Sequence, residues 1–267
     1  MIPTRLRHAV CALLVVVAAA GCSTKRNQVP PTSTDADKFL FDKGTDALKN
    51  KKWMPAREYF RQIVDNYPQS TYRPDAKLSV GDSYIGEHTT EALVLAVNEF
   101  REFLTFYPTS PRADYAQFRL STALAEQMLA AERDQTNTRE AVKELQIFID
   151  RYPNSAIMPE ARALYRKAKD RLSEAGYRVG FFYYRNRYWP GAIDRFKEVL
   201  RTDPGYTNRD AVYYYLAESL LKVNTEATKA EALPYFERLL KEFEQSSYLQ
   251  SARRRVEELK GATGAQR

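Results

Sequence analysis

One short motif occurs three times in this chain and limits the folds that the chain can adopt. Tyr-Pro-Xaa-Ser stands at residues 67–70, 107–110 and 152–155, so its copies follow one another at 40 and 45 residues. An alanine lies 12 residues before each proline, a large apolar residue eight before it, and a second alanine eight after it. Such a period predicts a repeat protein, in which each unit buries its apolar face only against its neighbours.

The spacing also predicts how each unit is built. Residues four apart lie on one face of an α-helix, so the small residue lets a neighbouring helix approach and the large residue fills the space beside it. Proline ends the helix and serine begins the turn into the next one. Two degraded copies keep the backward spacing near residues 204 and 244. The repeated positions are Ala56, Ala96, Ala141, Ala192 and Ala232; Phe60, Phe100, Leu145, Phe196 and Phe236; and Ala76, Ala116 and Ala161.

We therefore expect an all-α fold, an α-solenoid of five tetratricopeptide-like helix-turn-helix repeats with a short C-terminal helix. Alanine, a large residue and then proline resemble the tetratricopeptide repeat, and Gly44 and Gly180 stand where that family places its packing glycine. Successive repeat alanines are 40, 45, 51 and 40 residues apart, more than the family's period of about 34. The longest spacing predicts a helix from about Pro159 to Asn186, roughly 42 Å long.

The N-terminus reads as a lipoprotein signal. Two arginines precede an apolar run over residues 9–20, which is too short to span a bilayer. The following Ala-Ala-Gly-Cys resembles the lipobox of bacterial lipoproteins, which implies cleavage before Cys22 and a covalent lipid on its sulfur. By resemblance to Gram-negative lipoproteins, Ser23, rather than aspartate, after the cysteine implies onward export to the outer membrane. The alternative is an ordinary signal peptide followed by a chance cysteine.

Because Cys11 leaves with the signal and Cys22 carries the lipid, no disulfide is expected in the mature chain, and the core must hold the fold.

The chain divides into segments at the signal, the tether and the repeats. The segments that we expect are a signal peptide over 1–21, a flexible tether over 22–35, repeats 1 and 2 over 36–110, repeat 3 over 111–157, repeat 4 with its long first helix over 158–206, a degenerate repeat 5 and C-terminal helix over 207–260, and a tail over 261–267.

Composition argues against an enzyme. The mature chain has one histidine, His88, and no free cysteine, so Cys-His pairs, Ser-His-Asp triads and zinc sites built on histidine or cysteine lack parts. No glycine-rich phosphate loop occurs, and no carboxylate pair stands out from the many surface acids. We expect no metal and no cofactor besides the lipid.

The net charge is +7, and +5 without the signal's arginines. An exported chain rarely meets nucleic acid, so we expect no such partner. The basic residues, densest at residues 253–255, are either a solvated surface or a weak attraction to anionic lipid headgroups.

Several motifs together resemble one family. They are the lipobox, the five repeats with their turns, Arg133-Asp134-Gln135-Thr136, Arg171-Leu172, the run from Arg178 to Tyr183, and the run from Ala192 to Phe196. The chain resembles, over its whole mature length, the BamD (ComL) family of lipoproteins of the outer-membrane β-barrel assembly machinery.

The resemblance implies a location and partners. The lipid would hold the protein on the periplasmic face of the outer membrane, among other assembly lipoproteins. The C-terminal repeats would dock on the periplasmic domains of BamA, the barrel-forming partner, with the family's contacting arginine falling on Arg195; the alternative for Arg195 is an ordinary surface arginine. The N-terminal repeats would offer a groove to the C-terminal strand of unfolded outer-membrane proteins. The groove residues are expected to be Lys38, Phe41, Thr45, Lys49, Asp82, Phe118 and Thr122.

Two other functions remain open at this point. One is a periplasmic repeat scaffold for cell-wall or envelope complexes, like those of the Tol-Pal system; these usually lack a lipid anchor and carry a coiled coil before the repeats. The other is a peptidoglycan-binding or peptidoglycan-cleaving protein. Pull-down from lipidated, membrane-extracted material separates these functions by whether BamA or cell wall is recovered.

Cys22→Ala should give a folded but mislocalised protein, because no other segment of the sequence is a candidate anchor. Metabolic labelling with a fatty acid should tag the wild type and not the variant. Equal labelling of both proteins would contradict the lipoprotein interpretation.

Overall fold

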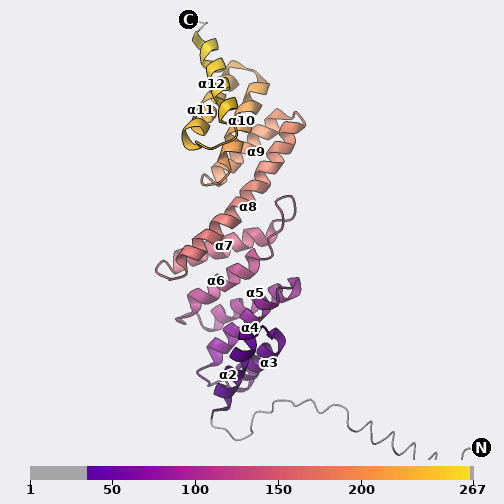
Figure 1. Ribbon diagram of the computed structural model, residues 1–267, viewed down its shortest axis with the longest axis vertical. Coiled ribbons are helices and arrows are strands. Elements are labelled where there is room, and N and C mark those ends of the chain that lie inside the picture. The colour runs from indigo at the N-terminus through magenta and orange to yellow at the C-terminus, as the bar shows by residue number, and fades with distance from the viewer. Residues whose placement is uncertain (1–34, 265–267) are drawn as a thin grey trace, which may run out of the picture.

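The computed structural model describes residues 35–264, with side chains to residue 261, and this part of the chain is all-α (Figure 1). Cys22, the signal peptide, nearly all of the tether and the end of the tail lie outside the described residues. The described helices are α2 (Ala36–Lys49), α3 (Trp53–Asn66), α4 (Arg73–Glu87), α5 (Thr90–Phe106), α6 (Ala113–Ala125), α7 (Thr136–Arg151), α8 (Met158–Arg185), α9 (Trp189–Thr202), α10 (Arg209–Val223), α11 (Glu226–Glu242) and α12 (Leu249–Gly264).

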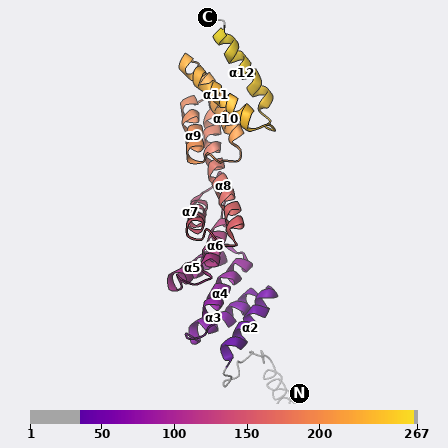
Figure 2. The same ribbon diagram turned by 90° about the vertical axis from the view of Figure 1, so that its left-hand side faces the viewer.

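The helices form consecutive antiparallel pairs in one elongated stack. Each helix packs on the next one along the chain, and the first helices of neighbouring pairs also touch: α2 with α4, α4 with α6, α6 with α8, and α8 with α10. Figures 1 and 2 show the stack in two perpendicular views, with α2 at one end and α12 at the other. The predicted all-α repeat fold is confirmed, and α12, with 16 residues, is as long as α7.

The core follows the register that the sequence predicts. The repeat alanines and their large partners, from Ala56 and Phe60 to Ala232 and Phe236, are all fully buried. The alanines eight residues after the prolines are fully buried as well. The two kinds of position therefore form the contact between neighbouring helices, as the helical spacing requires.

Glycines on the first helices receive the aromatic rings. A Cβ atom on Gly44 would lie 2.7 Å from the Phe60 ring, and one on Gly180 would lie 2.7 Å from the Phe196 ring. Gly81 takes the same place against Phe100, with 2.6 Å to the ring. Gly81 precedes Ala96 by 15 residues rather than 12, so the repeat spacing did not predict it. The shift arises because α5 is 17 residues long whereas α3 has 14.

The serine of the repeated turn has a role that spacing alone did not reveal. In two of the three motif copies, its hydroxyl donates a hydrogen bond to an aspartate in the first turn of the helix pair that the turn leaves. Ser70 reaches Asp37 at 2.5 Å and Ser155 reaches Asp114 at 2.6 Å. In the degenerate fifth repeat Ser246 keeps this bond, at 2.6 Å from Asp210. The hydroxyl thus fixes the turn onto the pair that it leaves.

The long helix α8 belongs to both halves of the stack. Its 28 residues match the length expected between residues 159 and 186. Ala161 and Ala168 pack with Leu145 and Phe148 of α7, whereas the C-terminal half packs on α9 through Gly180. Figure 1 shows α8 running from the lower helices to the upper ones. One continuous helix therefore sets how the two halves are placed.

Gly180→Ala should lower the free energy of unfolding by about 1 kcal/mol, because overpacking at the Phe196 ring costs about 1–3 kcal/mol and the gain in helix propensity is only about 1 kcal/mol. Gly261→Ala is the matched control, since a Cβ there has no atom within 4 Å. It should be neutral or slightly stabilising in chemical denaturation. Equal effects of the two changes would show that the ring does not fill the space over Gly180.

Candidate partner-binding surfaces

A buried ion pair joins α8 to the turn after α9. The Asp203 side chain is only 5% exposed. It accepts hydrogen bonds from both terminal nitrogens of Arg166, one at 3.0 Å, and from the hydroxyl of Ser173 at 2.6 Å. Burial alone would raise the pKa of Asp203, but the bonds from Arg166 and Ser173 outweigh it and lower the pKa below its ordinary 3.8.

A second chain of polar contacts crosses α8 farther along. Arg178 is paired with Glu174 on its own helix, at 2.6 Å, and with Glu132 of the α6–α7 loop. Glu174 in turn accepts a hydrogen bond from the Tyr206 hydroxyl, beyond α9. Arg171 donates to the carbonyl of Leu129 at 2.9 Å. The α6–α7 loop and the α9–α10 turn are therefore both fixed to the middle of α8.

The motif Arg133-Asp134-Gln135-Thr136 shapes that loop. Gln135 is buried and donates to the carbonyls of Ala130, at 2.7 Å, and Arg133, at 3.1 Å. Asp134 accepts bonds from the backbone and hydroxyl of Thr136, at 2.9 and 3.0 Å, which lower the pKa of its carboxyl group. The motif holds the loop in one conformation just before α7 begins.

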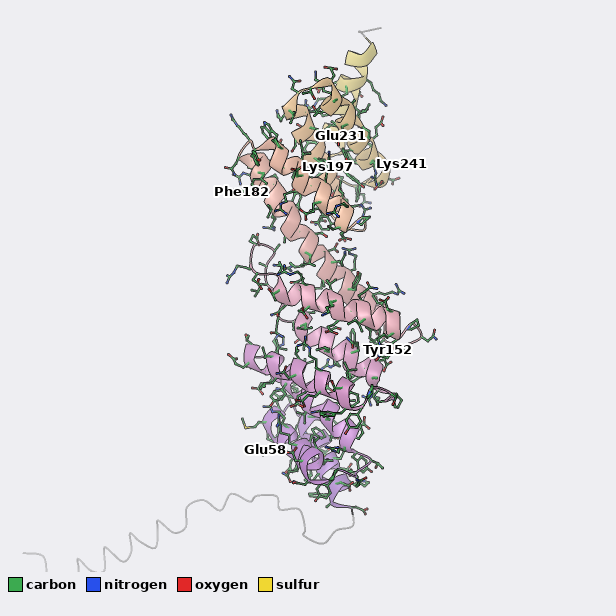
Figure 3. All side chains as sticks on the ribbon, turned by 180° about the vertical axis from the view of Figure 1, so that it is seen from behind. Glu58, Tyr152, Phe182, Lys197, Glu231 and Lys241 are labelled. Carbon is green, nitrogen blue, oxygen red and sulfur yellow. The ribbon has the colours of Figure 1, made fainter. Side chains whose placement is uncertain are left out.

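Apolar side chains are exposed beside this loop. Val179 is 41% exposed and Phe182 is 62% exposed. Together with Tyr183 they line one wall of a pocket whose other wall is the loop from Ala131 to Gln135. Figure 3 shows Phe182 at the outer edge of the stack. An aromatic ring held in this way on a rigid helix is typical of protein–protein interfaces.

Arg195 lies on the same side of the pair α8–α9. Its side chain is 48% exposed and is bonded only to Glu198 of its own helix, at 2.8 Å, among the described contacts. Gly191, one turn earlier on α9, faces Tyr183, because a Cβ there would lie 3.2 Å from that ring. Residues four apart share a helix face, so Arg195 lies on the same flank of α9 as Gly191, although Arg195 is not among the residues that line the pocket. We name Val179, Phe182, Tyr183 and Arg195, with the loop 131–135, the joint surface.

The expected groove residues of α2 share one face of that helix. Lys38, Phe41, Thr45 and Lys49 follow helical spacing. Phe41 is half-buried, its ring 5.7 Å from that of Phe60 and 5.1 Å from that of Tyr72. Lys38 pairs with Asp42 at 2.8 Å, Thr45 is half-buried and Lys49 is exposed.

The remaining groove residues lie on the next two first helices. Asp82 of α4 accepts bonds from Arg119 at 2.7 Å and Tyr115 at 2.8 Å, so it ties α4 to α6. Phe118 packs edge-on against Phe148, 6.0 Å between ring centres, and the Thr122 hydroxyl donates to the carbonyl of Phe118. The contacts among α2, α4 and α6 put these positions on one row of helices, but no described contact joins the α2 residues to Asp82 or Phe118.

The described residues provide neither a metal site nor a membrane-spanning helix. Within residues 35–264, no three His, Cys, Asp or Glu side chains are grouped so as to hold a metal ion. In the same part of the chain, no helix combines the length and the apolar character needed to cross a membrane. His88 ends α4 and lies 2.9 Å from Glu126.

Phe182 and Val179 are not among the binding residues that the sequence predicts. A signal was present, because Phe181 and Phe182 are adjacent and neighbouring helical side chains point about 100° apart. Phe181 packs against Tyr215, 4.8 Å between ring centres, so Phe182 must point elsewhere.

The stacked helix pairs make this chain a helical-repeat protein. Its long helix α8 exposes an aromatic side chain, that of Phe182, on a rigid surface. The chain matches the family described as "YfiO: Outer membrane lipoprotein" over residues 33–229. It therefore belongs to this family, the BamD/YfiO outer membrane lipoproteins.

Relatives named "Outer membrane protein assembly factor BamD" match most of the chain. That of Caulobacter vibrioides is 28% identical over 230 residues, covering 84% of this chain and 73% of the relative. That of Rickettsia prowazekii is 26% identical over 84% of this chain and 89% of the relative. That of Vibrio cholerae is 25% identical over 72% of this chain and 81% of the relative. Among solved structures, the "TPR2AB-domain:pHSP90-complex of yeast Sti1" is similar at a TM-score of 0.49 and 12% identity, covering 86% of this chain and 85% of that chain.

Asp203→Asn should cost about 2 kcal/mol of stability at pH 7, because the bonds to the charged carboxylate are lost. The lowered pKa of Asp203 means that this stabilisation is present above pH 4 and is lost as the pH falls below 3.8. The difference in melting temperature between wild type and variant should therefore be constant above pH 5 and narrow as the pH falls below 3.8. A difference that does not narrow below pH 3.8 would contradict the role of the ionised carboxylate.

Proposed function

We propose that this protein is a lipid-anchored scaffold of the outer-membrane β-barrel assembly machinery. It docks on a BamA-type barrel protein through the joint surface and works beside other assembly lipoproteins on the periplasmic face of the outer membrane. Its N-terminal repeats bind unfolded outer-membrane proteins before insertion. The protein acts by binding and positioning and not by catalysis.

The observation that carries this proposal is the convergence of separate segments at the joint surface. The loop 131–135 and the stretch Arg178–Tyr183 of α8 are distant in sequence but line one pocket, and Gly191, one turn before Arg195 on α9, lies against Tyr183. The motif Arg133–Thr136 and the long helix are also the parts of the chain that resemble the family most specifically. Polar contacts fix the loop to α8, so the exposed ring of Phe182 stands on a preorganised surface, which lowers the entropy lost on binding.

Arg195 adds charge specificity to this surface. Its present partner, Glu198, is itself about half exposed, and exposed pairs within one helix contribute little to stability. A carboxylate of the barrel protein can therefore replace Glu198 at small cost and form a charge-assisted, bidentate bond.

The groove for unfolded substrates is assigned to the row α2, α4 and α6. The face of α2 with Lys38, Phe41, Thr45 and Lys49 combines an aromatic ring with two ammonium groups. An extended, partly apolar strand of an unfolded barrel protein suits such a face, and its C-terminal carboxylate suits the lysines. Asp82, which is bonded to Tyr115 and Arg119, holds α4 to α6 within this row, whereas Phe118 packs on Phe148 of α7.

A scaffold of cell-wall or envelope complexes is the alternative. The family match and the named relatives support the assembly function instead. Recovery of the barrel protein, rather than of peptidoglycan, in a pull-down of the acylated protein would decide between the two.

Arg195→Glu should weaken binding to the periplasmic domains of the BamA-type partner at least about tenfold at an unchanged melting temperature, since loss of a desolvated charged contact costs about 2 kcal/mol or more. Arg201→Glu is the matched control: it is an exposed arginine of the same helix, outside the flank that carries Gly191 and Arg195. Calorimetry or surface plasmon resonance measures the affinities. Equal affinities of the two variants and the wild type would remove Arg195 from the binding surface.

A further inference from the structure

We propose that the turn between α2 and α3 contacts anionic lipid headgroups of the membrane to which the protein is anchored. We name Lys49, Lys51, Lys52 and Met54 the lysine tip. The inference depends on the predicted lipid at Cys22 only to place the tip at the membrane. A protein without the lipid keeps the charged and apolar side chains of the tip.

The tip has an excess of positive charge that the fold leaves unneutralised. Lys49, Lys51 and Lys52 are all exposed, and none of them forms an ion pair with another described residue. From residue 43 to residue 54 the chain carries four lysines and one aspartate, a net charge of +3. Glu87, next to the Gly86 on which Trp53 packs, is already paired with Arg57 at 2.7 Å.

The tip also has a fixed shape. Trp53 packs its ring over Gly86, where a Cβ would lie 2.6 Å away. The backbone N–H of Lys52 donates to the carbonyl of Ala47 at 2.9 Å, and Lys51 adopts a left-handed conformation with φ 57°. The lysines are thus presented on a rigid turn, and less conformational entropy is lost when they meet a surface.

An apolar side chain projects beside the charges. Met54 is 65% exposed in the first turn of α3. Flexible apolar side chains flanked by lysines suit the boundary between headgroups and acyl chains. Lysine ammonium groups are compact charges without the forked geometry that arginine uses for a single carboxylate, so they suit a diffuse anionic surface.

The length of chain outside the structure permits the contact. The chain enters α2 at the end opposite the tip, and the 14 residues of α2 span about 21 Å. The 13 residues from Cys22 to Thr34 reach about 40 Å when extended. A lipid on Cys22 and the tip can therefore meet one membrane plane at the same time.

The other dense basic group does not meet this condition. Arg253 and Arg254 are exposed but lie on α12, at the far end of the stack from α2 (Figure 2). Arg255 is bound to the buried Glu218, at 2.6 Å, so it fastens α12 to α10. This arginine group is the matched control for the tip.

The first test uses the mature chain with Cys22→Ser, so that no lipid contributes, and vesicles of phosphatidylglycerol and phosphatidylethanolamine. Each lysine near an anionic surface contributes about fivefold to partitioning. Lys51→Gln with Lys52→Gln and Met54→Ser should lower co-sedimentation at least about tenfold at an unchanged melting temperature. Arg253→Gln with Arg254→Gln should lower it less, because no large apolar side chain is exposed among the described residues of α12. Equal losses in both variants, or equal binding of the wild type to neutral vesicles, would overturn the proposal.

The second test uses the acylated protein in the same vesicles. Once Cys22 is acylated, Met54→Cys supplies a single thiol for an environment-sensitive fluorophore. The probe at residue 54 should shift to the blue and be quenched by brominated lipid, and a probe at Val223→Cys, an exposed position on α10, should not. A probe at residue 54 that stays fully open to aqueous quenchers would contradict the contact, whereas failure of the lipoprotein assignment itself would appear as absent acylation.

Discussion

In the first, second and fourth helix pairs, a phenylalanine ring packs directly against a glycine on the facing helix. Phe60 fills the space over Gly44, Phe100 that over Gly81, and Phe196 that over Gly180. The small residue lets the two helices approach closely, and the ring fills the space between them. Because each pair buries its face only against its neighbours, the stack, and with it every exposed surface, inherits its geometry from this contact.

The long helix turns this repeated geometry into specific surfaces. Its first half is packed on α7 and its second half on α9, so the residues between them bridge two separately packed cores. At the bridge the apolar core gives way to ion pairs, with Asp203 and Arg178 holding the adjoining loops in place. The side chains that point outward there, Phe182 above all, need not serve the core and remain available for a partner. The proposed docking surface and the proposed lipid contact thus lie at different places on one stack.

The fold could be predicted from the sequence because it is encoded by local spacing. The alanine and phenylalanine positions, the turns and the length of α8 all follow from helical periodicity. The joint surface could not be derived in the same way, since Glu132 and Arg178 are 46 residues apart and their contact depends on how two pairs stack. Gly81 was not predicted because a local insertion changes its spacing from Ala96. The hydrogen bond from Ser246 to Asp210 was not predicted because the fifth repeat has Glu244 in place of the proline. The positions named for the substrate groove came from family resemblance, and they stay predictions.

The most direct test of the account is photo-crosslinking in living cells. A benzoylphenylalanine at residue 182 should crosslink to the BamA-type barrel protein, because Phe182 is the most exposed large apolar side chain of the joint surface. Phe106 is the matched control, as an equally exposed phenylalanine, 68% against 62%, on another helix pair. The account predicts a crosslink to the barrel protein from residue 182 and none from residue 106. A crosslink from residue 106 alone, or equal crosslinks from both residues, would contradict it.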